Sequence, residues 1–149
     1  MKDRRPTTRA PKRFAGLLCA LCIAGCGGPR DGAVPVRGRV TRGGEPLAVK
    51  GRDLGLGYVE VHFYRIGDDG TTANDPADAA VEEPGDFTVR GKDGHGLPPG
   101  KYKITVRQLD PAPNTDKLGG RFNLKNSRIE REVTDGEDEI VIDVSRPEG

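Results

Sequence analysis

Apolar and polar residues alternate with a period of two along most of the chain after residue 33. In the clearest segment, Tyr102, Ile104 and Val106 are apolar and the residues between them are polar. Alternation of this kind places one face of a β-strand in a core and the other face toward solvent. No stretch after residue 26 shows a helical stripe, so the pattern predicts an all-β domain. Five further strands are predicted over residues 34–40, 59–63, 87–89, 129–133 and 140–144.

Turn-forming residues separate the predicted strands. Gly, Pro and Asp gather at residues 42–46, 84–86, 97–100 and 134–136. Six or seven short strands with turns at this spacing are typical of an antiparallel β-sandwich. A chain of 149 residues leaves room for one domain, which we expect over residues 33–146. The alternative, a largely disordered acidic tail, does not easily explain the alternation.

Several strand and turn motifs resemble those of the carboxypeptidase regulatory-like, or transthyretin-like, domain. The resemblance covers roughly residues 34–145 and implies an antiparallel Greek-key β-sandwich, transthyretin-like or immunoglobulin-like. It carries no catalytic residue over, because such motifs specify fold and not activity. The Gly-rich stretch 49–57 departs from the pattern and is expected to be an insertion. The motifs are Val36-x-Gly38-x-Val40, Gly44-x-Pro46-Leu47, Val59-x-Val61-x-Phe63, Gly85-Asp86-Phe87 and Leu97-Pro-Pro-Gly-Lys-Tyr102.

The first 26 residues predict export and lipidation. A basic stretch ends at Arg13, and a 12-residue apolar run, residues 14–25, follows it. As a helix this run would span about 18 Å against about 30 Å of hydrocarbon, so it suits a signal peptide better than a membrane span. Ile23-Ala-Gly-Cys26 resembles the bacterial lipobox. The resemblance implies a cleaved lipoprotein signal peptide over residues 1–25, then the lipidated Cys26 and a tether over residues 26–32.

The expected location is therefore the cell envelope, on the extracytoplasmic face of a membrane in the periplasm or at the cell surface. An ordinary secretory signal is the alternative. Cys19 and Cys22 fall within the predicted signal peptide, and no cysteine follows Cys26, so the domain forms no internal disulfide.

Charge excludes one class of partner. The whole chain has a net charge of +1, but residues 26–149 hold 18 basic and 22 acidic residues. A mildly acidic domain lacks the basic surface that nucleic-acid binding needs, so we expect no nucleic-acid partner.

Few side chains could carry catalysis or hold a metal. The two histidines are His62 and His95, and His62 shares one strand face with Tyr58 and Tyr64 by parity, which favours a surface role over an iron site. The acidic loop after the second predicted strand does not match the ligand spacing of an EF-hand. We expect no catalytic residue and no cofactor, and we expect no metal; the candidates for calcium would be Asp68, Asp69 and Asp75.

These patterns favour a non-enzymatic function in envelope structure, adhesion or protein assembly. The expected partners are the membrane, through lipid on Cys26, and an envelope protein or a glycan. Two alternatives stay open: a glycan- or calcium-binding module, and a metalloenzyme that uses His62 or His95.

Strand parity also predicts where the loops lie. If six strands alternate in direction, the loops after the second and fourth strands leave from the same end. Residues 68–83 hold six acidic and no basic residues, whereas residues 117–131 hold five basic residues and one acidic. We expect these two segments to face each other, near the tether. The loops at 42–57 and 91–100 would then point away from the membrane toward a partner.

Overall fold

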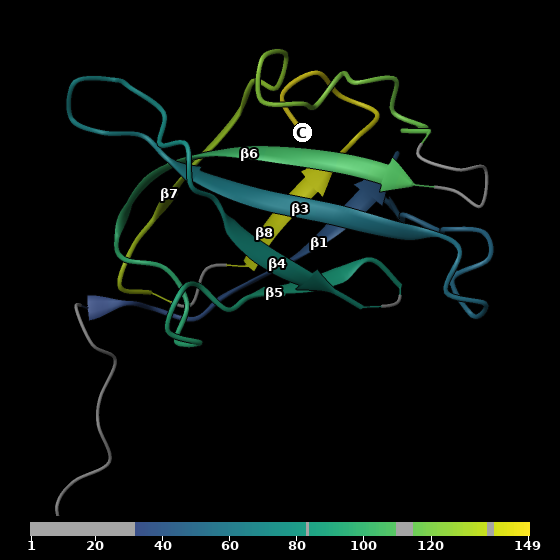
Figure 1. The fold of residues 1–149 in the computed structure, drawn as a ribbon, viewed down its shortest axis with the longest axis horizontal. Coiled ribbons are helices and arrows are strands. Elements are labelled where there is room, and N and C mark those ends of the chain that lie inside the picture. The colour runs from purple at the N-terminus through teal and green to yellow at the C-terminus, as the bar shows by residue number, and fades with distance from the viewer. Residues whose placement is uncertain (1–31, 83, 110–114, 137–138) are drawn as a thin grey trace, which may run out of the picture.

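The computed structural model describes residues 32–82, 84–109, 115–136 and 139–149, and these residues form an all-β fold without an α-helix. The prediction of an all-β domain is confirmed. One curled sheet holds all the strands (Figure 1). The Greek-key arrangement stays a prediction. The strands are β1 (Val36–Arg42), β2 (Glu45–Pro46), β3 (Tyr58–Arg65), β4 (Ala77–Val81), β5 (Asp86–Val89), β6 (Gly100–Leu109), β7 (Ile129–Val133) and β8 (Glu139–Asp143).

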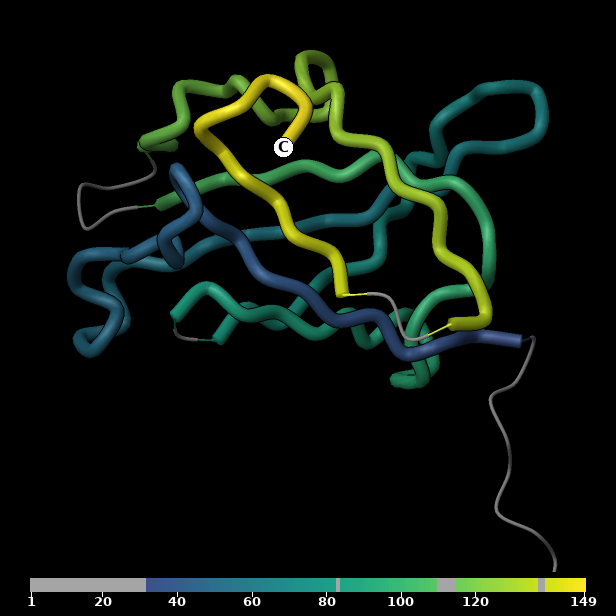
Figure 2. Tube along the Cα trace, turned by 180° about the vertical axis from the view of Figure 1, so that it is seen from behind, coloured from purple at the N-terminus to yellow at the C-terminus, as the bar shows by residue number. Residues whose placement is uncertain are grey.

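The strands follow the order β7-β6-β3-β4-β5-β1 across the sheet, with β2 paired to the end of β1. Neighbouring strands along this path are antiparallel. The last strand, β8, pairs with β1 in parallel, with Gly38 opposite Ile140 and Val40 opposite Ile142. The first and last strands of the domain therefore run side by side in the same direction (Figure 2).

The alternating apolar side chains line the inner face of the curled sheet. Ile104 and Val106 in β6 are fully buried, as are Val40 in β1 and Ile142 in β8. The Phe63 ring packs against Phe87 with 5.9 Å between their centroids, which joins β3 to β5 across the core. The predicted inward faces are confirmed for these strands, whereas Thr105, a polar residue expected on the outward face of β6, is also buried.

The sheet has two distinct ends, which we name from the place where the chain joins it. The proximal end is where residues 33–35 lead into β1, and it also carries the loops at 66–76 and 90–99. The distal end carries residues 43–57 and the last residue of β6, Leu109, which lies opposite Tyr58 at the start of β3.

One strand was missed, and it overturns the predicted facing of the charged loops. Residues 77–81 form β4, which lies between β3 and β5. Strands β3 and β6 are direct antiparallel neighbours. The last residue of β3 and the last residue of β6 therefore lie at opposite ends of the sheet. The acidic segment 68–83 therefore starts at the proximal end, and the basic segment 117–131 follows the distal end of β6. The loop at 91–100 lies beside the incoming chain and does not point away from it, because Val34 and Leu97 bond to each other.

The predicted signal peptide, Cys26 and all of the tether except Gly32 lie outside the described residues. Within the part of the chain that the structure describes, no helix is long and apolar enough to cross a membrane.

Candidate functional site

Residues 50–57 form a projecting turn at the distal end, which we call the distal turn. It displays Leu54 and Leu56, whose exposed fractions are 70% and 55%. Tyr58, the next outward residue, is 46% exposed. Among the described residues only two other large hydrophobic side chains are comparably exposed, Leu124 and Val141, and they lie elsewhere in the chain.

The distal turn has a defined backbone conformation. Gly51 accepts hydrogen bonds from the N–H groups of Leu54 and Leu56, at 3.2 and 2.9 Å. The N–H of Gly55 donates to the carbonyl of Arg52 at 2.8 Å. The Arg52 guanidinium in turn donates to the carbonyl of Val81 at the end of β4. The two leucines are therefore held outward by a bonded turn that is tied to the sheet.

Exposed apolar side chains on a structured turn indicate a contact surface. A single exposed leucine is ordinary in a soluble protein, but two exposed leucines two positions apart on one turn are a candidate for burial by another surface. The local sequence explains why they stay outside: Leu54 and Leu56 alternate with glycines in a segment too short to fold back onto the core. The arrangement can bind by burial of apolar surface, and it offers no nucleophile or acid–base pair.

The three candidate calcium ligands do not form one site. Asp75 pairs with Lys92 of the neighbouring loop. The Asp69 carboxylate accepts hydrogen bonds from the N–H and hydroxyl of Thr71, at 3.0 and 2.6 Å, and these bonds lower its pKa. Asp68 is exposed in the same turn as Asp69. In the described ranges no three His, Cys, Asp or Glu side chains come together as metal ligands would.

The two histidines lie on different elements. His62 is on the outer face of β3, where its Nδ1 lies 2.6 Å from an Asp78 oxygen and its Nε2 lies 3.9 Å from a Glu60 oxygen. The two carboxylates thus approach opposite sides of the ring and do not converge on one point. His95 is exposed in the proximal loop at 90–99. Tyr58 and Tyr64 share the outer face of β3 with His62, as parity predicted.

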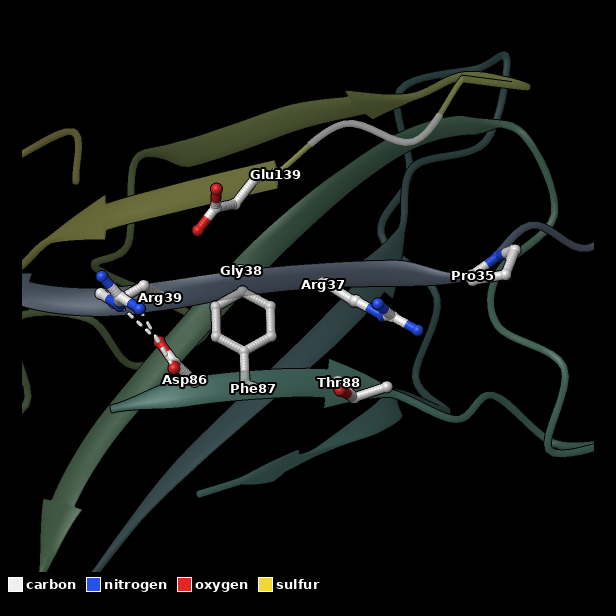
Figure 3. A pocket seen from close by; sticks show the side chains of 8 residues that line it. All are labelled: Pro35, Arg37, Gly38, Arg39, Asp86, Phe87, Thr88 and Glu139. Atoms are coloured by element: carbon white, nitrogen blue, oxygen red, sulfur yellow. Dashed lines mark hydrogen bonds and ion pairs between the residues drawn. The ribbon is translucent and has the colours of Figure 1, made fainter. Parts of the chain in front are cut away.

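A hollow of about 320 Å³ lies over the outer side of β1, β5 and β8 (Figure 3). Its floor is formed around Gly38, where an added Cβ would come within 2.1 Å of the Ile140 carbonyl oxygen and 2.5 Å of the Phe87 ring. No side chain fits at Gly38, because the backbone of β8 and the Phe87 ring approach it closely. This packing explains the glycine at the centre of the Val36-x-Gly-x-Val40 motif.

An ion pair occupies one side of this hollow. Arg39 in β1 pairs with Asp86 in β5, and its Nη2 donates to Asp86 Oδ2 at 3.1 Å. The hydrogen bond with Arg39 lowers the pKa of Asp86, and the same bond raises the pKa of Arg39. Because these residues are also backbone partners in the β1–β5 ladder, the pair helps fix the strand register.

No family model matches this chain, and comparison with curated proteins and with solved structures also gives no match. The candidate site therefore rests on geometry alone. Sequence reasoning placed a contact surface at 42–57 from loop position, but it did not single out Leu54 and Leu56. The signal that could have found them is a pair of leucines between glycines, outside any strand pattern.

Proposed function

We propose that this chain is a non-catalytic, lipid-anchored envelope protein that assembles with another envelope protein through the distal turn. The observation that carries the proposal is the pair Leu54 and Leu56, presented outward on a turn whose backbone is bonded and tied to β4. Burial of both side chains by a partner supplies the driving force for assembly.

The position of the distal turn supports a partner away from the anchoring membrane. In the proposal lipid is attached at Cys26, and residues 26–32 then span at most about 24 Å. The first described residues, Gly32 and Ala33, lie at the proximal end of the domain. The leucines lie beyond the opposite end of β3, an eight-residue strand about 26 Å long. A partner located in or across the envelope could therefore contact Leu54 and Leu56 without approaching the anchoring membrane.

The fold we propose is the Greek-key sandwich that the motif resemblance implies. The placement of the motifs supports it: Gly38 lies at the tight contact between β1 and β8, and Tyr102 begins the buried row of β6. The curl of the single sheet around one core also supports the proposal (Figure 2).

The anchor is tested by mass spectrometry of the N-terminal peptide from the intact protein. We expect the mature chain to begin at Cys26 and to carry a thioether-linked diacylglycerol. Cys26→Ser should accumulate as unprocessed precursor without the lipid mass. A mature chain that begins elsewhere and carries no lipid would refute the anchor.

The distal turn is tested by site-specific photo-crosslinking in intact cells. A photoreactive residue at position 54 should give one discrete adduct, whereas the same residue at position 141, which is also exposed, should not. The double variant Leu54→Ser/Leu56→Ser should lose the partner that co-purifies with the wild type, and Val141→Ser should retain it. Both variants should melt within a few degrees of the wild type, since exposed positions change stability by only about 0.5 kcal/mol. Equal retention, or equal loss, of the partner in the two variants contradicts a specific role for the distal turn.

A further inference from the structure

A second concave feature, the proximal pocket, lies at the opposite end of the domain from the distal turn. It has a volume of about 390 Å³. Phe63, Leu97 and Tyr102 underlie its floor and are each at least 97% buried. The apolar surface open to a ligand comes from Ala73, Ala77 and Pro98. The rings of Phe63 and Tyr102 meet edge to face with 6.3 Å between centroids. Charged side chains stand only at its rim, and this combination of apolar floor and polar rim is typical of small-molecule sites.

The wall of the proximal pocket is preformed. Val34 and Leu97 exchange two backbone hydrogen bonds, at 2.8 and 2.9 Å, which fix the loop at 90–99 to the incoming chain. The N–H of Gly96 closes the same loop by donating to the carbonyl of Arg90 at 3.0 Å. A Cβ at Gly96 would come within 1.9 Å of the Val34 oxygen, so the loop closes as tightly as backbone allows. A ligand would not need to order this wall on binding.

The rim charges are unevenly matched. Asp75 pairs with Lys92 across the two proximal loops, and Asp93 also acts electrostatically on Lys92. Both rim carboxylates therefore act electrostatically on the same lysine, and Asp75 contacts it directly. Arg65, in contrast, makes only a long hydrogen bond of 3.4 Å to the carbonyl of Pro99, and within the described residues it forms no ion pair.

The Tyr102 side chain fixes the floor beside Arg65. Its hydroxyl donates to the carbonyl of Pro98 at 2.8 Å. Burial raises the pKa of this phenol, and this effect is larger than the opposite effect of the positive charge on Arg65. The phenol therefore stays neutral at physiological pH. The floor is therefore uncharged and apolar. Among the described rim residues, Lys92 is paired with a carboxylate, whereas Arg65 has no ion pair.

We propose that the proximal pocket binds a small apolar carboxylate, with its hydrocarbon body against Ala73, Ala77 and Pro98 and its carboxylate on Arg65. A planar guanidinium binds a carboxylate through two parallel hydrogen bonds, which are stronger than bonds between neutral groups. This binding is additional to the proposed assembly function and does not depend on it, since the two surfaces lie at opposite ends.

Isothermal titration calorimetry of the intact chain in a neutral maltoside detergent tests the proposal. The probes are 3-phenylpropanoate and its amide, which share a hydrocarbon body and differ in charge. We expect the carboxylate to bind saturably and at least about tenfold more tightly than the amide, the ratio that corresponds to about 1.4 kcal/mol. Absence of saturable binding of the carboxylate would overturn the proposal.

Three variants locate the interaction. Arg65→Gln should bring the two probes to equal affinity, whereas Arg128→Gln, an exposed arginine outside the pocket, should keep the tenfold preference. Ala77→Leu places a larger side chain in the pocket lining and should weaken both probes together. A preference for the carboxylate that survives Arg65→Gln, or unchanged binding in a folded Ala77→Leu protein, would refute this site. Thermal melting of each variant confirms that it is folded.

Discussion

The proximal loop at 90–99 and the distal turns around Asp116 and Asp143 are closed by different kinds of contact. At the proximal end, backbone meets backbone around Gly96, with no space for a side chain. At the distal end, the carboxylates of Asp116 and Asp143 accept the N–H groups that the connecting turns leave without partners. Backbone closure builds a fixed concave wall that does not titrate. Carboxylate closure depends on pH, because protonation weakens the carboxylate as an acceptor of hydrogen bonds.

The largest difference between the ends is expected from adding one methyl group at each. Gly96→Ala should lower the free energy of unfolding by about 3 kcal/mol, because the new Cβ meets the Val34 oxygen and the residue has a positive φ of 107°. Gly55→Ala in the distal turn also has a positive φ, 68°, but no atom within 4 Å, so it should cost about 1 kcal/mol. Urea unfolding of both variants measures the comparison, and equal losses would remove the distinction between the ends.

A smaller effect is expected at the distal end from the Asp116 carboxylate. It accepts three backbone hydrogen bonds, from Gln108 and Leu118 at 3.1 and 3.0 Å and from Gly120 at 2.9 Å. Asp116→Ala leaves these N–H groups without that acceptor and should lower the free energy of unfolding by about 2 kcal/mol. Asp116→Asn keeps one acceptor oxygen and should lose less. If the alanine and asparagine variants melt at the wild-type temperature, carboxylate closure does not stabilise this end.

The smallest effect is a pH dependence at Asp143. Hydrogen bonds from the N–H and hydroxyl of Ser145, and then from the N–H of Gly43, lower the pKa of this carboxyl from 3.8 to about 2. Since the folded pKa lies below the unfolded one, the stabilisation is fully present above pH 3.8 and is lost as the pH falls toward 2. Amide exchange at Gly43 and Ser145 should therefore lose its protection over that interval, and Asp143→Asn should abolish this dependence. The Gly96 amide, bonded to a carbonyl, serves as the internal control.

Strand β6 and strand β4 show how far the sequence predicts this fold. In β6, large apolar residues alternate with polar ones, so periodicity alone placed Tyr102, Ile104 and Val106 in the core. In β4, the sequence Ala-Asp-Ala-Ala-Val has no large apolar side chain before Val81, and its residues are only partly buried or exposed. Its strand conformation comes from pairing with β3 and β5, a tertiary effect that local pattern does not carry. One missing strand then reversed the predicted placement of the loop at 91–100 and of the start of the basic segment 117–131.

The candidate surfaces were predictable to different degrees. Placing residues 42–57 at the far end from the incoming chain required only the count of strands before them, and that placement is confirmed. The proximal pocket required knowing that Asp75 and Lys92, 17 positions apart in the sequence, meet across two loops. It also required knowing that Arg65 lies in the same pocket as the buried rings of Phe63 and Tyr102. Neither relation has a sequence period, so neither could be predicted.

The parallel pairing of β1 with β8 has a mechanical consequence. A force that pulls the incoming chain away from the domain acts along the axis of β1, whose ladders to β5 and β8 lie on either side of it. Hydrogen bonds across a ladder that is pulled lengthwise are loaded together, in shear, whereas a strand peeled from a free edge loses them one at a time. The first strand is thus clamped on both sides at the point where tension from a membrane anchor would arrive, and the last strand of the domain forms half of the clamp.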